Sequence, residues 1–109
     1  MANLDFQNVF DTLKKEVTNL ALSTVKGYVK EATADALSLV EKMKENLKTW
    51  TLELANNEIS AKDYEFLILG QKELLEMNAL KQAGLAQIKI DEFKNSILNG
   101  IVTTVIGFI

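Results

Sequence analysis

Apolar residues recur every three or four positions along the first half of the chain, and this spacing constrains the fold more than any other feature. The pattern begins at Phe6 and continues to Leu54, with Lys, Asp and Glu on the opposite side. No alternation of apolar and polar residues, which a half-buried β-strand needs, competes with it. The spacing predicts one amphipathic helix over residues 3–55. Gly27 is its weak point, because glycine disfavours helix interiors.

A longer period is superimposed on this apolar stripe. Its clearest members lie eleven positions apart: Phe6, Val17, Tyr28, Leu39 and Trp50. This period corresponds to about 3.67 residues per turn and keeps an apolar face straight along a long helix. Such a helix belongs either to a bundle or to a lipid surface. The mixture of acids and Lys on its polar side favours the bundle, because helices that lie on membranes are enriched in basic residues there.

A turn and a helix start are encoded at residues 56–63. Asn56 or Asn57 can take the left-handed conformation that ends helices. Four residues mark the next start: Ile59, Ser60, Asp63 and Tyr64. The serine and the aspartate have the spacing of a capping box, and the isoleucine and the tyrosine have that of a hydrophobic staple. We predict a turn over 56–60 and a second helix over 61–107.

Two helices joined by so short a turn must run antiparallel. The predicted fold is therefore all-α, a long two-helix hairpin that forms a single helical domain over residues 1–109. Each helix is about 75 Å long if unbroken. The second helix carries two adjoining apolar stripes, which is more apolar surface than one partner helix covers. Either the helices break near Gly27 and Gly84 and fold back into a compact bundle, or two hairpins associate. We expect self-association, because neither glycine is flanked by the residues typical of turns.

Residues 95–109 carry no charged side chain. On a helix their apolar side chains gather on one face and their small ones on another. We predict that this segment supplies the interaction surface: Ile97, Leu98, Ile101, Val102, Val105, Ile106, Phe108 and Ile109. Three interpretations stay open. The segment is buried in the bundle or in an oligomer seam, it inserts shallowly into a membrane or lipid surface, or it is a disordered or β-prone tail.

The composition excludes several kinds of chemistry. The chain has no His and no Cys, which excludes zinc sites, thiol nucleophiles and Ser-His triads. It has no Arg, and its net charge is −3, so we expect no nucleic-acid binding. The acidic pairs Glu73/Glu76 and Asp91/Glu92 lack the pattern of a calcium loop. We therefore expect no enzymatic activity, no metal and no cofactor.

The expected function is that of a non-enzymatic structural or interaction protein that acts through protein–protein contacts. Its expected partners are further copies of itself, so that it forms a homo-oligomer, and in addition another protein. The alternative is an amphipathic protein that binds or perturbs a lipid or membrane surface through residues 95–109. The first residues lack the basic and apolar regions of a secretory signal, so we expect a cytoplasmic location, peripheral at a membrane in the alternative.

Overall fold

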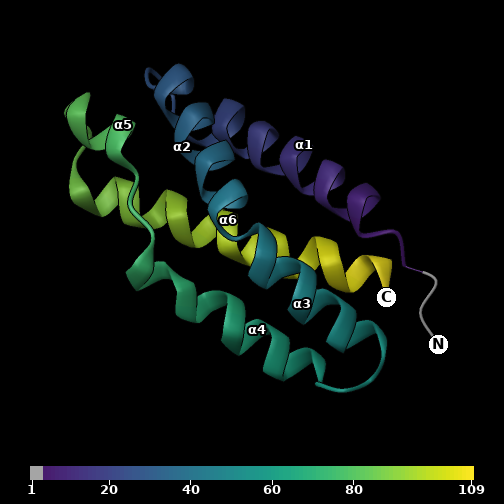
Figure 1. Ribbon diagram of the computed structural model, residues 1–109. Coiled ribbons are helices and arrows are strands. Elements are labelled where there is room, and N and C mark those ends of the chain that lie inside the picture. The colour runs from purple at the N-terminus through teal and green to yellow at the C-terminus, as the bar shows by residue number, and fades with distance from the viewer. Residues whose placement is uncertain (1–3) are drawn as a thin grey trace.

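The computed structural model describes residues 4–109, in which helices alternate with sharp breaks (Figure 1). These residues contain no strand, and their elements follow in the order α1 (Phe6–Thr24), α2 (Val29–Lys42), α3 (Lys44–Ala55), α4 (Ala61–Leu69), the 3-10 helix η1 (Gly70–Leu74), α5 (Asn78–Gln82) and α6 (Gln87–Phe108). The body measures 46 × 23 × 19 Å. An unbroken helix over 3–55 would be about 80 Å long. The simple two-helix hairpin is therefore wrong, although the predicted helix start at residue 3 lies outside the described residues.

The first break lies at Gly27, where the predicted helix 3–55 divides. Gly27 has a φ of +86°, a backbone conformation that L side chains rarely adopt. The backbone NH of Tyr28 donates a hydrogen bond to the carbonyl of Val25 at 3.3 Å and closes the turn. Helix α2 then packs against α1. The apolar stripe of the sequence is thus divided at Gly27 between α1 and the helices that follow it, and does not form one long helix.

Helices α2 and α3 are separated only by Met43. Its NH donates to the carbonyl of Leu39 at 3.1 Å, and its carbonyl accepts from the NH of Leu47 at 2.7 Å, as in a continuous helix. All three side chains are buried. The predicted stripe is therefore continuous across this junction.

The turn after α3 has the predicted chemistry. Asn57 adopts a φ of +61°, and the NH of Glu58 donates to the carbonyl of Glu53 at 2.8 Å, which is the hydrogen bond of a Schellman motif. The Ser60 hydroxyl accepts from the NH of Asp63 at 3.0 Å, and the Asp63 carboxylate accepts from the NH of Ser60 at 3.1 Å. Helix α4 therefore starts at the capping box that the sequence indicates.

The predicted helix 61–107 is divided into α4, η1, α5 and α6. Leu75 is extended, with φ −113° and ψ 135°, and ends η1. Gly84 has a φ of +93°, and the NH of Leu85 donates to the carbonyl of Leu80 at 3.2 Å. This is a second Schellman motif, and it turns the chain from α5 into α6. The chain thus folds back at both glycines. From the sequence we had judged this arrangement less favourable than self-association of unbroken hairpins.

Helix α5 is held by a side chain far away in the sequence. Asp35, on α2, is only 7% exposed. Its carboxylate accepts hydrogen bonds from the backbone NH groups of Ala79 at 3.0 Å and Leu80 at 2.7 Å. These NH groups lie in the first turn of α5, where no carbonyl of the helix itself can accept them. Asp35 therefore acts as the N-terminal cap of α5.

Replacing Gly27 or Gly84 by Ala is expected to lower the free energy of unfolding by about 1 kcal/mol, because the new Cβ is strained at positive φ. The reduced entropy of the unfolded chain offsets part of this cost. Gly107→Ala is the control: Gly107 is helical with open space around it, so this change is expected to stabilise by up to about 1 kcal/mol. Urea denaturation followed by circular dichroism measures all three. Equal effects at the three glycines would contradict the assigned role of positive φ.

Tyr64 joins α4 to α3 inside the core. Its side chain is fully buried, and its hydroxyl shares a hydrogen bond of 2.9 Å with the buried hydroxyl of Thr51. Ile59, the other predicted staple residue, is half-buried against the core. Burial raises the pKa of Tyr64 from 10.0 to about 12, and the hydrogen bond to Thr51 opposes this shift only in part. The phenol is therefore kept neutral in the folded protein.

This shift predicts a loss of stability in alkali. The raised pKa favours the neutral phenol in the folded state. The contribution of Tyr64 to the free energy of unfolding is therefore complete below pH 10 and is lost between pH 10 and pH 12. At pH 11 the expected loss is about 1 kcal/mol. Comparing the free energy of unfolding at pH 9 and pH 11 in the wild type and in Tyr64→Phe isolates this contribution. An equal decline in both proteins would rule it out.

Candidate interaction surface

Most of the predicted C-terminal surface lies inside the core of a single copy. Helix α6 contacts α1 and α4, and five of the eight predicted residues are buried side chains of this helix: Ile97, Leu98, Ile101, Val102 and Val105. A Cβ on Gly100 would lie 3.3 Å from the Leu20 side chain, so the small residue permits a close approach within the chain. Of the three interpretations considered for residues 95–109, burial in the bundle is the one that describes these five residues.

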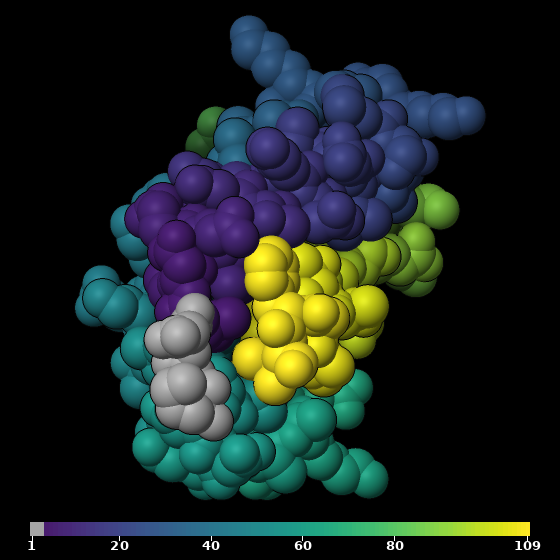
Figure 2. Space-filling view, turned by 90° about the vertical axis from the view of Figure 1, so that its right-hand side faces the viewer, coloured from purple at the N-terminus to yellow at the C-terminus, as the bar shows by residue number. Residues whose placement is uncertain are grey.

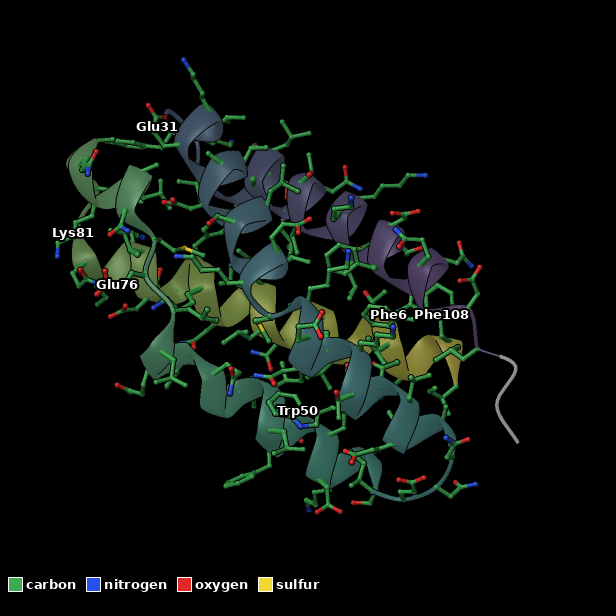
Figure 3. The ribbon with its side chains drawn as sticks, viewed as in Figure 1. Phe6, Glu31, Trp50, Glu76, Lys81 and Phe108 are labelled. Atoms are coloured by element: carbon green, nitrogen blue, oxygen red, sulfur yellow. The ribbon has the colours of Figure 1, made fainter. Side chains whose placement is uncertain are left out.

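The remaining three predicted residues lie at the end of α6. Ile106 is 40% exposed, Ile109 is 55% exposed, and Phe108 is half-buried against the core. Figure 2 shows this end of α6, in yellow, at the surface beside the first turns of α1. Phe6 and Phe108 lie at this same end of the molecule (Figure 3). The exposed part of the predicted surface is thus a small apolar tip.

The most exposed large apolar side chain of the described residues is Phe66, on α4, at 78%. Leu74, at the end of η1, is 75% exposed. The other exposed large apolar residues are scattered over α1 and both ends of α6: Leu22, Ile88, Ile106 and Ile109. Our sequence interpretation missed Phe66. The available signal was its position two residues after Tyr64, off both apolar stripes, which on a helix places it opposite the buried side.

The outer face of α4 has a defined pattern around Phe66. Tyr64 and Ile68 are buried, and the turn of 100° per residue places Phe66 opposite them. Lys62 and Leu69 lie on one side of Phe66, within about 60°, and Asp63 and Gly70 lie on the other side within about 60°. The hydrogen bonds from Ser60 hold the pKa of Asp63 below its usual 3.8, so this carboxylate is charged at neutral pH. We refer to these five residues, Lys62, Asp63, Phe66, Leu69 and Gly70, as the α4 face.

Three of the four acidic residues considered in the sequence line a polar hollow of about 440 Å³ between η1 and α6: Glu73, Glu76 and Asp91. Glu92 does not line it. Lys94 also lines it, but its ammonium donates hydrogen bonds to the carbonyls of Lys72, at 3.1 Å, and Leu75. Lys94 thus satisfies carbonyls at the end of η1. Within residues 4–109 no three Asp or Glu side chains are grouped closely enough to hold a metal ion.

The half-buried Trp50 lies against the core, between α3 and α4 (Figure 3). It is the one tryptophan of the chain, so its fluorescence reports on this region. None of the helices in the part of the chain described is long and apolar enough to cross a membrane. No family model, curated protein or solved structure matches the chain.

Proposed function

We propose that this chain is a non-enzymatic interaction protein that associates with a second copy of itself through the α4 face. The exposure of Phe66 is the observation that carries the proposal. Burying a phenylalanine side chain contributes about 1.5–3 kcal/mol, and aromatic residues are enriched at the centres of protein interfaces. Phe66 is directed away from its own core, so only another molecule can cover it.

The proposed contact differs from the seam expected from the sequence. The wide apolar faces of α1, α2 and α6 are covered within one copy, where their residues form a common core cluster. The fold therefore does not need a second chain to complete its core. The associating species is a folded protein with a small exposed apolar surface. We therefore expect a weak dimer whose population depends on the protein concentration.

Sedimentation equilibrium over a wide concentration range tests the proposal. We expect the mass to rise from 12.2 kDa toward about 24 kDa as the protein concentration reaches several hundred micromolar. The reason is that an interface of one helix face lies at the low end of known interface sizes. A mass that stays at that of the monomer up to about 1 mM would contradict self-association.

A second candidate function is binding to a lipid surface through the tip of α6. It is supported by the exposure of Ile106 and Ile109 at the end of a segment without charged side chains. Shallow insertion of a few apolar side chains is sufficient for interfacial binding.

Flotation with vesicles of mixed phosphatidylcholine and phosphatidylglycerol tests this candidate. We expect the wild type to float and the double variant Ile106→Ser, Ile109→Ser to stay at the bottom of the gradient. Ile88→Ser, which removes an exposed isoleucine from the opposite end of α6, is the matched control and should float like the wild type. If the wild type itself does not float, the lipid function is refuted.

A further inference from the structure

Gly70 has no role within its own chain that requires a glycine. Its φ of −66° and ψ of −14° are those of an ordinary helical residue. Apart from its two chain neighbours and the adjacent helical backbone, no atom of the described residues lies within 4 Å of the position where a Cβ would be. Glycine costs about 1 kcal/mol relative to alanine in such a conformation. It is therefore suited to a close approach from outside the chain, one turn of helix from the exposed Phe66.

The two sides of the α4 face are complementary to each other in charge and in size. The side with Lys62 also carries Leu69, so it is basic and large. The side with Asp63 also carries Gly70, so it is acidic and small. When two copies are related by a two-fold axis parallel to α4, the side of one copy with Lys62 contacts the side of the other copy with Asp63. In an antiparallel arrangement centred on Phe66, each side instead contacts the same side of the other copy with its ends exchanged. Lys62 then faces Leu69, Asp63 faces Gly70, and neither charge is paired.

We infer that two copies pair through their α4 faces, with the helices side by side and parallel. Phe66 of each copy lies at the centre, against Phe66 of the other. Leu69, which is half-buried against the core of its own copy, presents its exposed part over Gly70 of the other. Lys62 of each copy faces Asp63 of the other. This inference rests on the proposed self-association and adds to it the orientation of the two helices and the residues that face each other.

The energetic roles of these residues differ. Phe66 supplies most of the affinity, because it loses most contact with water. The exposed ion pairs add little affinity, but they favour the parallel orientation, because Lys62 and Asp63 are paired only in that arrangement. Because a two-fold contact uses the same surface on both copies, it closes at the dimer and leaves no face for further growth.

Two variants with matched controls test the apolar part by sedimentation velocity. Phe66→Ser is expected to raise the dimer dissociation constant at least tenfold, whereas Ile88→Ser, also at an exposed apolar residue, leaves it unchanged. Gly70→Leu fills the space that Leu69 of the other copy needs and is expected to weaken the dimer similarly. Gly107→Leu is its control, since Gly107 is helical and open but lies on α6. Circular dichroism checks that each variant remains folded.

A charge variant tests the orientation. Lys62→Glu places two acids opposite each other in each half of the dimer and is expected to raise the dissociation constant about fivefold at low ionic strength. The effect should fade in 1 M salt, where charges are screened beyond about 3 Å. Lys30→Glu is the control, because Lys30 is also the second residue of its helix and exposed.

The outcomes distinguish self-association from the specific pairing through the α4 faces. If the wild type dimerises and both Phe66→Ser and Gly70→Leu behave like their controls, the α4 pairing is wrong although self-association stands. If only Lys62→Glu behaves like its control, the parallel orientation is wrong. If the wild type is monomeric at every concentration, both the self-association and the α4 pairing are refuted.

Discussion

Deletion of residues 95–109 is expected to unfold the whole protein. The deletion removes five side chains of α6 that are almost completely buried. Truncating one such aliphatic side chain to alanine typically costs 2–5 kcal/mol, and domains of this size are stable by only about 5–15 kcal/mol. The loss therefore exceeds the whole stability, and α1 and α4 both lose the helix that they contact.

The deletion variant should show a far-ultraviolet circular dichroism spectrum with little helix and no cooperative urea transition. Its Trp50 fluorescence should resemble that of the denatured wild type. The control is the double variant Ile106→Ser, Ile109→Ser, which changes the exposed end of the same segment and should unfold cooperatively near the wild-type midpoint. A truncated chain that keeps native helix content would mean that the core closes without α6.

Replacing Asp35 by Ala is expected to lower the free energy of unfolding by about 3 kcal/mol. The change leaves the NH groups of Ala79 and Leu80 without their acceptor, and the second of these hydrogen bonds is buried. Losing a cap costs about 0.5–2 kcal/mol, and hydrogen bonds to a charged group contribute about 1.5–3 kcal/mol. Helix α5 is too short to form without this support.

Two controls isolate the contribution of burial. Asp5 also caps a helix, accepting a hydrogen bond from the NH of Gln7 at 3.1 Å, but it is exposed. Asp5→Ala should therefore cost only about 1 kcal/mol. Asp35→Asn keeps one acceptor oxygen and should fall between the wild type and Asp35→Ala. Native-state hydrogen exchange gives a direct readout, since the amide of Leu80 should lose protection most. Equal costs for Asp5→Ala and Asp35→Ala would contradict the assigned role.

The local features of the fold were predictable because they depend on neighbouring residues. The capping box of Ser60 and Asp63 and the left-handed Asn57 follow from short-range chemistry. The all-α class follows from spacing alone. The break at Gly27 was harder to decide, because the stripe continues in phase across it: Ala21 and Val25 before it and Ala32 after it are all buried. A continuous pattern therefore does not show that the helix is continuous.

The long-range features were not predictable from periodicity. Asp35 looks like a surface acid in the sequence, and only the tertiary fold places it against the start of α5. The same holds for the C-terminal segment, for which the sequence left open burial in the bundle or in an oligomer seam, insertion into a lipid surface, and a disordered or β-prone tail. An apolar stripe shows that a helix packs against another surface. It does not show whether that surface belongs to the same chain or to another molecule. Phe66 was missed for the converse reason, because it lies off every stripe.

The contact between the first and the last helix has a consequence for biosynthesis. Helix α1 is covered by α6, and Leu20 lies close to Gly100. At roughly 5–20 residues per second, the ribosome needs several seconds to make the chain between them. During that interval the apolar side of α1 is only partly covered, by α2, and is accessible to chaperones. Native closure of α1 must therefore await the emergence of α6 from the exit tunnel.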